Sequence, residues 1–309
     1  MTKHLLFSIA LPIALLAKGC NGSDTPLSNQ SENMPAGFVS ANYATTAEAP
    51  APMTNEPRIQ QKKTSEYQSA KGATKTAVFQ TFKPLLAAPI KGERLLIREG
   101  YTVSYNTEKR QPNYVAWYLT PQRLKGNNKR SEFFYEDAEL NDNEKSLLDD
   151  YYNSGFDRGH LCPAGDNKWS RRAMIESFYL SNISPQTHSL NNESWRILEE
   201  ACREWVRFGH RNIYIISGPI FSDKQTRKIK RRIPVPAQFF KALLCLDKGK
   251  ESGIAFIYDN NTENQTMQGT AVSIDKVEEI TGYDLFNTVN KNLQEKLERQ
   301  SNFGAWKRQ

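Results

Sequence analysis

The composition of this chain limits where a folded domain can form. From Asn21 to about Lys75 the sequence is rich in Ser, Thr, Ala, Asn and Pro and poor in large apolar residues. Such a segment buries too little apolar surface to offset the loss of its chain entropy. Apolar and aromatic residues become frequent from about Val78 onward. We therefore expect a flexible tether over 21–75 and a folded domain over 76–309.

The N-terminus has the pattern of an export signal. Lys3 supplies a positive charge, and Leu5 to Ala17 form an apolar run of thirteen residues, too short to span a bilayer of about 30 Å. Ala17-Lys18-Gly19-Cys20 resembles a bacterial lipoprotein cleavage box. We expect residues 1–20 to be a lipoprotein-type signal peptide. Lipidated Cys20 would then anchor the exported protein to a membrane, either in the periplasm or at the cell surface. Ordinary signal cleavage and secretion are the alternative.

The net charge indicates the class of partner only weakly. Lys and Arg number 41 against 34 for Asp and Glu, which gives a formal charge of +7. A positive balance favours polyanions such as nucleic acids through the summed electrostatic field. Because many proteins are mildly basic, this charge alone does not identify the partner.

Three cysteines remain after Cys20, namely Cys162, Cys202 and Cys245. An exported protein permits a disulfide, and an odd count leaves one thiol over. The sequence does not choose the pair, and all three residues could equally be small buried hydrophobes.

Apolar patterning predicts a mixture of strands and helices. The predicted strands are 101–105, 114–120, 213–216, 243–246 and 254–258, with Pro112-Asn113 as a break between the first two. Helical spacing relates Trp195, Leu198, Cys202 and Trp205, and Asn192 is a candidate N-cap for that helix. Further helices are predicted around 277–280 and 293–297. The mixed order favours an α+β domain with a largely antiparallel sheet over a doubly wound one.

Residue types suited to phosphodiester cleavage gather within about fifty positions. Phe156-Asp157-Arg158-Gly159-His160-Leu161-Cys162-Pro163 is followed by Asn182-Ile183-Ser184-Pro185-Gln186 and then by Asn191. A neutral imidazole takes a proton from water near neutral pH, and an amide oxygen suits Mg²⁺. Guanidinium groups suit phosphate oxygens. Gly159 is expected to allow a tight turn or a close approach to a ligand.

Several of these residues also have ordinary structural interpretations. Asn191 or Asn192 could be only a helix N-cap, because the helix is expected to begin near Asn192 or Glu193. Glu199 and Arg203 could be an exposed helix pair contributing about 0.3–0.5 kcal/mol, rather than an acid near metal-bound water and a cation near phosphate. The basic run from Lys224 to Arg232 could follow a nucleic-acid backbone or form a solvated loop.

The combined motifs resemble the DNA/RNA non-specific endonuclease family, which includes secreted bacterial nucleases and mitochondrial endonuclease G. The resemblance covers roughly Tyr101 to Glu298. It rests on Asp157-Arg158-Gly159-His160, Ser181-Asn182-Ile183-Ser184-Pro185-Gln186, Leu190-Asn191, Trp195, Glu199, Arg203 and Thr281-Gly282-Tyr283-Asp284-Leu285-Phe286.

The resemblance implies a ββα-metal nuclease fold, with a largely antiparallel central sheet flanked by helices, and a role for each site residue. His160 would be the general base, and Asn191 the only direct protein ligand of Mg²⁺, for which Mn²⁺ could substitute. The metal-bound waters would be held by Asp157 and Glu199. The phosphate would be bound by Arg158, Arg203 and, through a looser alignment, Arg130. Cys162 replaces a small residue, so oxidation near the site could matter.

The resemblance therefore implies an exported, Mg²⁺-dependent endonuclease that cleaves DNA and RNA with little sequence specificity and leaves 5′-phosphate products. Two alternatives stay open: a surface lipoprotein that binds nucleic acid without cutting it, and a phosphodiesterase for small phosphate esters. A zinc hydrolase is disfavoured because His4, His160, His188 and His210 show no ligand spacing. The sequence leaves both a monomer and a homodimer open.

Overall fold

The computed structural model describes residues 84–209, 211–222 and 227–307. The predicted signal peptide, tether and lipidated Cys20 lie outside these residues, as do positions 76–83 of the predicted domain. No helix within the described ranges is long and apolar enough to cross a membrane.

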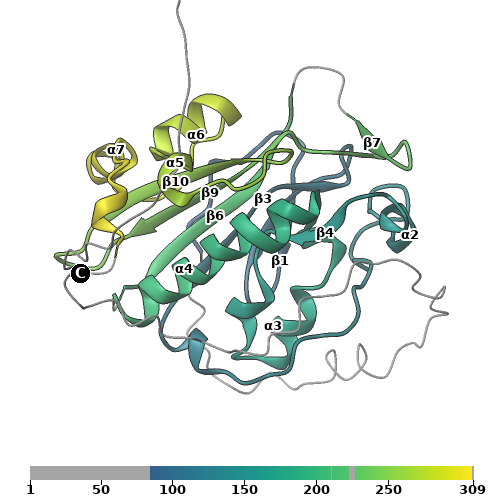
Figure 1. The fold of residues 1–309 in the computed structure, drawn as a ribbon, viewed down its shortest axis with the longest axis horizontal. Coiled ribbons are helices and arrows are strands. Elements are labelled where there is room, and N and C mark those ends of the chain that lie inside the picture. Colours follow the sequence, from purple (N-terminus) through teal and green to yellow (C-terminus); the bar gives the residue numbers. More distant parts are fainter. Residues whose placement is uncertain (1–83, 210, 223–226, 308–309) are drawn as a thin grey trace, which may run out of the picture. The chain divides into compact units, whose positions relative to one another are not determined.

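A seven-stranded antiparallel sheet forms the centre of the fold, in the order β1-β2-β3-β6-β9-β10-β11, and β4-β5 and β7-β8 form two small antiparallel sheets (Figure 1). The strands are β1 (Arg94–Ile97), β2 (Thr102–Asn106), β3 (Gln111–Leu119), β4 (Asp157–His160), β5 (Ile183–Gln186), β6 (Ile213–Ile220), β7 (Lys228–Ile229), β8 (Ile233–Pro234), β9 (Gln238–Cys245), β10 (Ser252–Asp259) and β11 (Ala271–Val272). The helices are η1 (Arg123–Lys125), α2 (Leu148–Tyr151), η2 (Ala164–Asn167), α3 (Arg171–Glu176), η3 (Leu180–Asn182), η4 (Leu190–Trp195), α4 (Arg196–Arg207), α5 (Met267–Thr270), α6 (Ile274–Thr281), α7 (Lys291–Glu298) and η5 (Phe303–Ala305). The predicted α+β class and largely antiparallel sheet are confirmed.

Successive residues of a strand point to opposite faces of the sheet. Both faces of the central sheet carry buried apolar side chains, and helices pack against each face. Ile215 packs in the same cluster as the buried stripe of α4, which includes Leu198. The next residue, Ile216, packs in a different cluster with Val277 of α6 and Leu297 of α7. Figure 1 shows α4 lying along the sheet, with α6 and α7 grouped near β10. The apolar spacing of α4 and of both C-terminal helices was thus predicted from the sequence and is confirmed.

The predicted strand break at Pro112-Asn113 is wrong. Both residues belong to β3, where Pro112 pairs with Tyr105 of β2 beside a register shift at Ser104/Tyr105. Pairing of β3 with β6 begins only at Val115. Pro112 therefore has a strand neighbour on one side only, a position at which the missing N–H is tolerated.

A compact β4–β5–helix unit carries the sequence motifs. Strands β4 and β5 pair antiparallel, with Gly159 opposite Ser184, and the chain then enters the π-helix η4 and continues into α4. The prediction that this helix begins at Asn192 or Glu193 under an Asn192 cap is wrong. The Asn191 N–H already donates to Thr187 O at 3.0 Å, so the first helical turn lies upstream of Asn192.

The structure resolves the alternatives for the cysteines. Cys162, Cys202 and Cys245 are free and buried. Burial raises the pKa of all three thiols, that of Cys202 to about 12. Because the thiolate is the reactive form, Cys162 is poorly suited to the oxidation considered from the sequence.

Candidate active site

His160 lies at the end of β4 in a cluster of three rings. Its side chain is buried, and its ring packs against both Phe134 and Phe178, with ring centroids 5.3 Å and 4.8 Å away. The two phenylalanine centroids are themselves 5.0 Å apart, so the three rings form a compact triangle. The Phe178 contact is edge-to-face, at 81°. The Nε2 atom is buried and has no hydrogen-bond partner. These ring contacts pack the imidazole from one side and leave its Nε2 atom uncommitted.

Two arginines lie over the same two phenylalanines. The guanidinium carbon of Arg130 is 4.9 Å from the Phe178 ring centroid, and that of Arg158 is 4.6 Å from the Phe134 centroid. Burial lowers the pKa of His160 well below 6.5, and the charges of Arg130 and Arg158 lower it further. Two of the three arginines predicted to bind phosphate, Arg130 and Arg158, thus lie near a neutral imidazole.

Gly159 has a different role from the one expected. Its backbone does not adopt a positive φ. Instead, a Cβ at this position would lie 2.1 Å from Gln186 Oε1 and 2.5 Å from Gln186 Cγ. The fully buried Gln186 side chain of β5 occupies the space that any other residue would need. Gly159 therefore permits β4 and β5 to pack so that His160 is correctly placed.

Asn191 is oriented by Asp157. The Asn191 Nδ2 atom donates to Asp157 Oδ2 at 3.0 Å, which leaves the amide oxygen available for another partner. The ring nitrogen Nδ1 of the exposed His188 lies 3.0 Å from the same carboxylate oxygen. His188 was not singled out from the sequence, because a lone histidine outside the motif carries no chemical signal.

The helix that carries Asn191 is fastened to the strand that carries His160. Trp195 Nε1 donates to the backbone oxygen of His160 at 3.1 Å, and Asn191 contacts Asp157 at the start of the same strand. Two hydrogen bonds thus fix η4 against β4. The sequence prediction that these segments form one site is consistent with this arrangement.

Glu199 lies in a buried group of charges. Burial raises its pKa to about 7, and the positive charges of Lys241, Arg203 and Arg130 oppose that rise. Arg130 interacts electrostatically with both Glu199 and His160. Glu199 therefore belongs to the same electrostatic environment as the imidazole and changes its charge near neutral pH.

Arg203 has a structural partner that the sequence did not indicate. Its Nη1 atom forms a 3.1 Å ion pair with Asp166 Oδ1, and Asp166 Oδ2 accepts a hydrogen bond from Trp117 Nε1 at 3.0 Å. Of the two interpretations left open by the sequence, the exposed Glu199–Arg203 ion pair is not what the structure shows: the ion pair of Arg203 is with Asp166, although Arg203 and Glu199 still interact electrostatically. Arg203 is thus tied to the core by one side of its guanidinium group.

Lys241 is the most prominent charge that the sequence analysis missed. It lies in β9, is fully buried, and places Nζ 4.4 Å from the Trp195 ring centroid and 4.9 Å from that of Trp117. Its ammonium group stabilises the ionised form of Glu199. A signal was present, because Lys241 interrupts an apolar run between Phe240 and Ala242.

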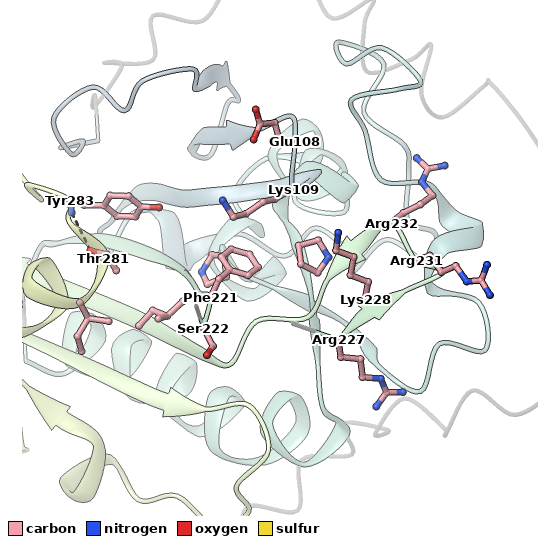
Figure 2. A pocket seen from close by; sticks show the side chains of 14 residues that line it. Glu108, Lys109, Phe221, Ser222, Arg227, Lys228, Arg231, Arg232, Thr281 and Tyr283 are labelled. Atoms are coloured by element: carbon pink, nitrogen blue, oxygen red, sulfur yellow. Dashed lines mark hydrogen bonds between the residues drawn. The ribbon is translucent and has the colours of Figure 1, made fainter. Parts of the chain in front are cut away.

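A second feature is a basic groove of about 1230 Å³ (Figure 2). Figure 2 shows Tyr283 at one end of it, Lys228 and the arginines of the β7–β8 hairpin at the other, and Lys109 between them. Arg227, at the hairpin end, lies over the Phe156 ring at 4.8 Å, and Phe156 directly precedes the motif. The groove lining includes four of the basic residues in the run 224–232, namely Arg227, Lys228, Arg231 and Arg232, whereas Lys224 lies outside the described residues.

The donors at the motif fit a hydrated magnesium ion. One amide oxygen is available from Asn191, and the Asp157 carboxylate lies beside it. Mg²⁺ retains several waters and needs few direct protein ligands. Carboxylates nearby can accept hydrogen bonds from those waters, so these residues are compatible with the expected cation.

Comparison with known proteins finds nuclease relatives of this chain. Residues 84–292 match the family model of DNA/RNA non-specific endonucleases. A nuclease from Nostoc sp. is 33% identical over 215 residues, covering 66% of this chain and 77% of the relative. Human mitochondrial endonuclease G is 37% identical over 162 residues, which cover 49% of this chain and about half, 54%, of that relative.

The structural comparison supports the fold. One chain from a crystal structure of the EndoG/EndoGI complex superposes with a TM-score of 0.59 at 24% identity, covering 65% of this chain and 89% of that chain. The predicted ββα-metal nuclease fold is confirmed by this similarity.

Proposed function

Because this chain belongs to the DNA/RNA non-specific endonuclease family and is therefore a metal-dependent nuclease, we propose that it is an exported Mg²⁺-dependent enzyme that cleaves both DNA and RNA. The products would carry 5′ phosphates. The observation that carries this proposal is a buried, neutral His160 packed against two phenylalanines, each of which has an arginine over its ring. His160 lies on the same strand, β4, as Asp157, which accepts a hydrogen bond from Asn191.

The environment of His160 suits a general base. A buried imidazole flanked by two cations stays unprotonated at neutral pH, so it can take a proton from a water aimed at phosphorus. Such a base contributes about 10²–10⁴ in rate, or roughly 3–5 kcal/mol. Phosphodiester hydrolysis requires more, so electrostatic stabilisation must supply the remainder.

The residues around His160 supply that stabilisation. Arg130 and Arg158 would bind non-bridging phosphate oxygens, and their positions over the two phenylalanines that pack against His160 support this role. Asn191 would hold the cation through its amide oxygen, while Asp157 and Glu199 would accept hydrogen bonds from the waters on it. The cation would contribute charge stabilisation at the phosphate and at the leaving 3′ oxygen. Arg203, held by Asp166, would act on the phosphate only through its remaining guanidinium nitrogens.

Recognition of the phosphate backbone would explain why one site cleaves both DNA and RNA. Contacts to phosphate and sugar carry no base sequence, so a site built on arginines and one cation accepts DNA and RNA. The basic groove would extend this backbone contact beyond the cleaved bond, since Arg227 joins the groove to Phe156 beside the motif.

Export rests on the N-terminal sequence. If Cys20 is lipidated, the protein fractionates with membranes, and Cys20→Ser shifts it to the soluble fraction without changing nuclease activity. Recovery of the wild type in the soluble fraction would instead indicate ordinary signal cleavage. The oligomeric state, monomer or homodimer, is measured on the same preparations.

The decisive assay compares polymers with a small substrate. Supercoiled plasmid, single-stranded RNA and a dinucleotide are incubated with the protein in Mg²⁺, Mn²⁺ or EDTA, and the product ends are identified by enzymatic labelling. The proposal expects metal-dependent cleavage of both polymers and 5′-phosphate ends. Binding without cleavage would indicate a nucleic-acid-binding lipoprotein, and cleavage of the dinucleotide alone would indicate a small-substrate phosphodiesterase.

A further inference from the structure

A second cluster of carboxylates lies on the face of the sheet opposite α4. Asp275 and Glu278 belong to α6, and Glu298 ends α7. One oxygen from each lies within 4.8 Å of the other two. No other group of at least three His, Cys, Asp or Glu ligands with this spacing occurs in the described part of the chain. The cluster shares no residue with the proposed active site.

The spacing of these oxygens suits a common cation. Calcium–oxygen distances are about 2.3–2.6 Å, so oxygens on opposite sides of one Ca²⁺ ion are about 4.6–5.2 Å apart. Three oxygens that are mutually within 4.8 Å can therefore contact one ion. Carboxylate-rich sites favour Ca²⁺, whereas Mg²⁺ keeps more of its waters.

Glu298 provides an independent indication of a missing partner. Its side chain is only 4% exposed, and its buried Oε1 atom has no hydrogen-bond partner. A buried carboxylate oxygen without a partner is costly. Burial and the negative charge of Glu278 raise the pKa of Glu298 to about 8, although a hydrogen bond with the Gln294 side chain acts in the opposite direction.

The surroundings are acidic even though the chain is basic overall. A hollow of about 390 Å³ is lined by the three carboxylates and also by Asp284 and Glu295, against the cations Lys291 and Arg299. Arg299 lies 3.7 Å from Glu295, which is outside the cluster. Glu278 already accepts a backbone hydrogen bond from Leu285 at 2.6 Å. These contacts leave the three clustered carboxylates without a cationic partner among the described residues.

We propose that Asp275, Glu278 and Glu298 bind a hard divalent cation, best matched by Ca²⁺, that fastens α7 to α6. The ion would be structural, because the cluster lies across the sheet from the motif residues. Its binding goes beyond the proposed nuclease activity and does not depend on it.

The test separates this site from the catalytic one. The full chain carrying Asn191→Ala, which lacks the proposed catalytic ligand, is unfolded thermally at pH 8.5 with increasing CaCl₂. We expect the unfolding temperature to rise with the logarithm of Ca²⁺ concentration, by about 5–10 °C at a hundred times the dissociation constant. Isothermal titration should show one Ca²⁺ per chain.

A matched pair of variants decides the assignment. Adding Glu298→Gln to the Asn191→Ala chain should abolish both the Ca²⁺-dependent rise in unfolding temperature and the binding of Ca²⁺ in the titration. Adding Glu279→Gln, which removes the same charge from α6 at an exposed residue paired with Lys276, should preserve both. Equal responses in the two variants, or no Ca²⁺ binding in their parent, would overturn the proposal and indicate that the carboxylates share protons instead.

Discussion

At the scale of single residues, the site depends on keeping one imidazole neutral while placing positive charge beside it. Burial and two arginines both act in this direction on His160. The phenylalanines allow the combination, because each ring contacts the imidazole and supports a guanidinium group on its face. His160 therefore stays available as a base throughout the neutral pH range.

The first pH prediction concerns Glu199. Its pKa of about 7 means that it gains a proton, and loses its negative charge, as the pH falls through 7. Protonated Glu199 would then accept weaker hydrogen bonds from metal-bound water. We expect kcat/KM for plasmid cleavage to decline below about pH 7 and the decline to move to lower pH as Mg²⁺ is raised, since cation and proton compete.

Glu199→Gln is the control for this profile. It should have low activity with no inflection near pH 7. An inflection that stays at the same pH at all Mg²⁺ concentrations, or that persists in Glu199→Gln, would assign the titration to another group.

Lys241 provides a second test of the same charge group. Lys241→Met removes a cation that stabilises ionised Glu199, so the pKa of Glu199 should rise and the acid limb of kcat/KM should move above pH 7. Lys241 acts here as a positioning residue, and a purely structural role would lower activity equally at every pH. The measurement is the pH profile of Lys241→Met beside that of Lys276→Met, an exposed lysine on α6.

At the scale of elements, β4, β5 and η4 form the frame on which the site is built. Trp195 bonds to the backbone of β4, and Asn191 bonds to Asp157. The π-helical turn η4 precedes α4, so Asn191 lies within a helical segment rather than at its cap. This frame explains how a strand and a helix thirty residues apart bring their side chains into one site.

Gly159→Ala tests that frame. The added methyl group would overlap the buried Gln186 side chain, so β4 must move away from β5. We expect a loss of about 1–3 kcal/mol in the free energy of unfolding, typical of overpacking, together with at least a tenfold loss of kcat. Chemical denaturation and plasmid cleavage measure the two effects. Unchanged activity and stability would contradict this account of Gly159.

The sequence indicated which motif residues come together better than it indicated the contacts that support them. Asp157, His160 and Asn191 are recognisable because their spacing in the motifs is specific. Asp166 was not recognisable, because its roles as partner of Arg203 and Trp117 arise only from folding. Lys241 could have been noticed as a charge within an apolar strand.

Element types were also more predictable than element boundaries. The strands from 213, 243 and 254 follow from apolar runs. The extension of β3 through Pro112 could not be predicted in this way, because it depends on β6 pairing with β3 only from Val115 onward. The start of the α4 segment depends on a π-turn that has no N-cap side chain to mark it.

At the scale of the described domain, charge is unevenly distributed. A basic groove adjoins the motif through Arg227 and Phe156, while an acidic hollow lies beside α6 and α7. This separation suits a polyanion that binds along one side. The net charge of +7 does not reveal this separation, because composition does not say where the charges lie.

Salt dependence tests the groove. Replacing Lys109 and Lys228 with Gln should weaken binding of a long DNA duplex and reduce the slope of log K against log salt by up to about 1.8, or 0.9 for each phosphate that the variant no longer neutralises. Binding is measured by fluorescence anisotropy with Ca²⁺ in place of Mg²⁺. Lys276→Gln is the control, and an equal slope in the wild type, the double variant and this control would exclude the groove from the binding path.

The most direct test of the central claim is the rate of plasmid and RNA cleavage by His160→Ala beside the wild type, at equal Mg²⁺ and with DNA affinity and thermal stability measured on the same samples. The account predicts a fall in rate of about 10²–10⁴-fold, the usual contribution of a general base, with affinity and unfolding temperature retained. A His160→Ala protein that folds, binds DNA and cuts at the wild-type rate would contradict it.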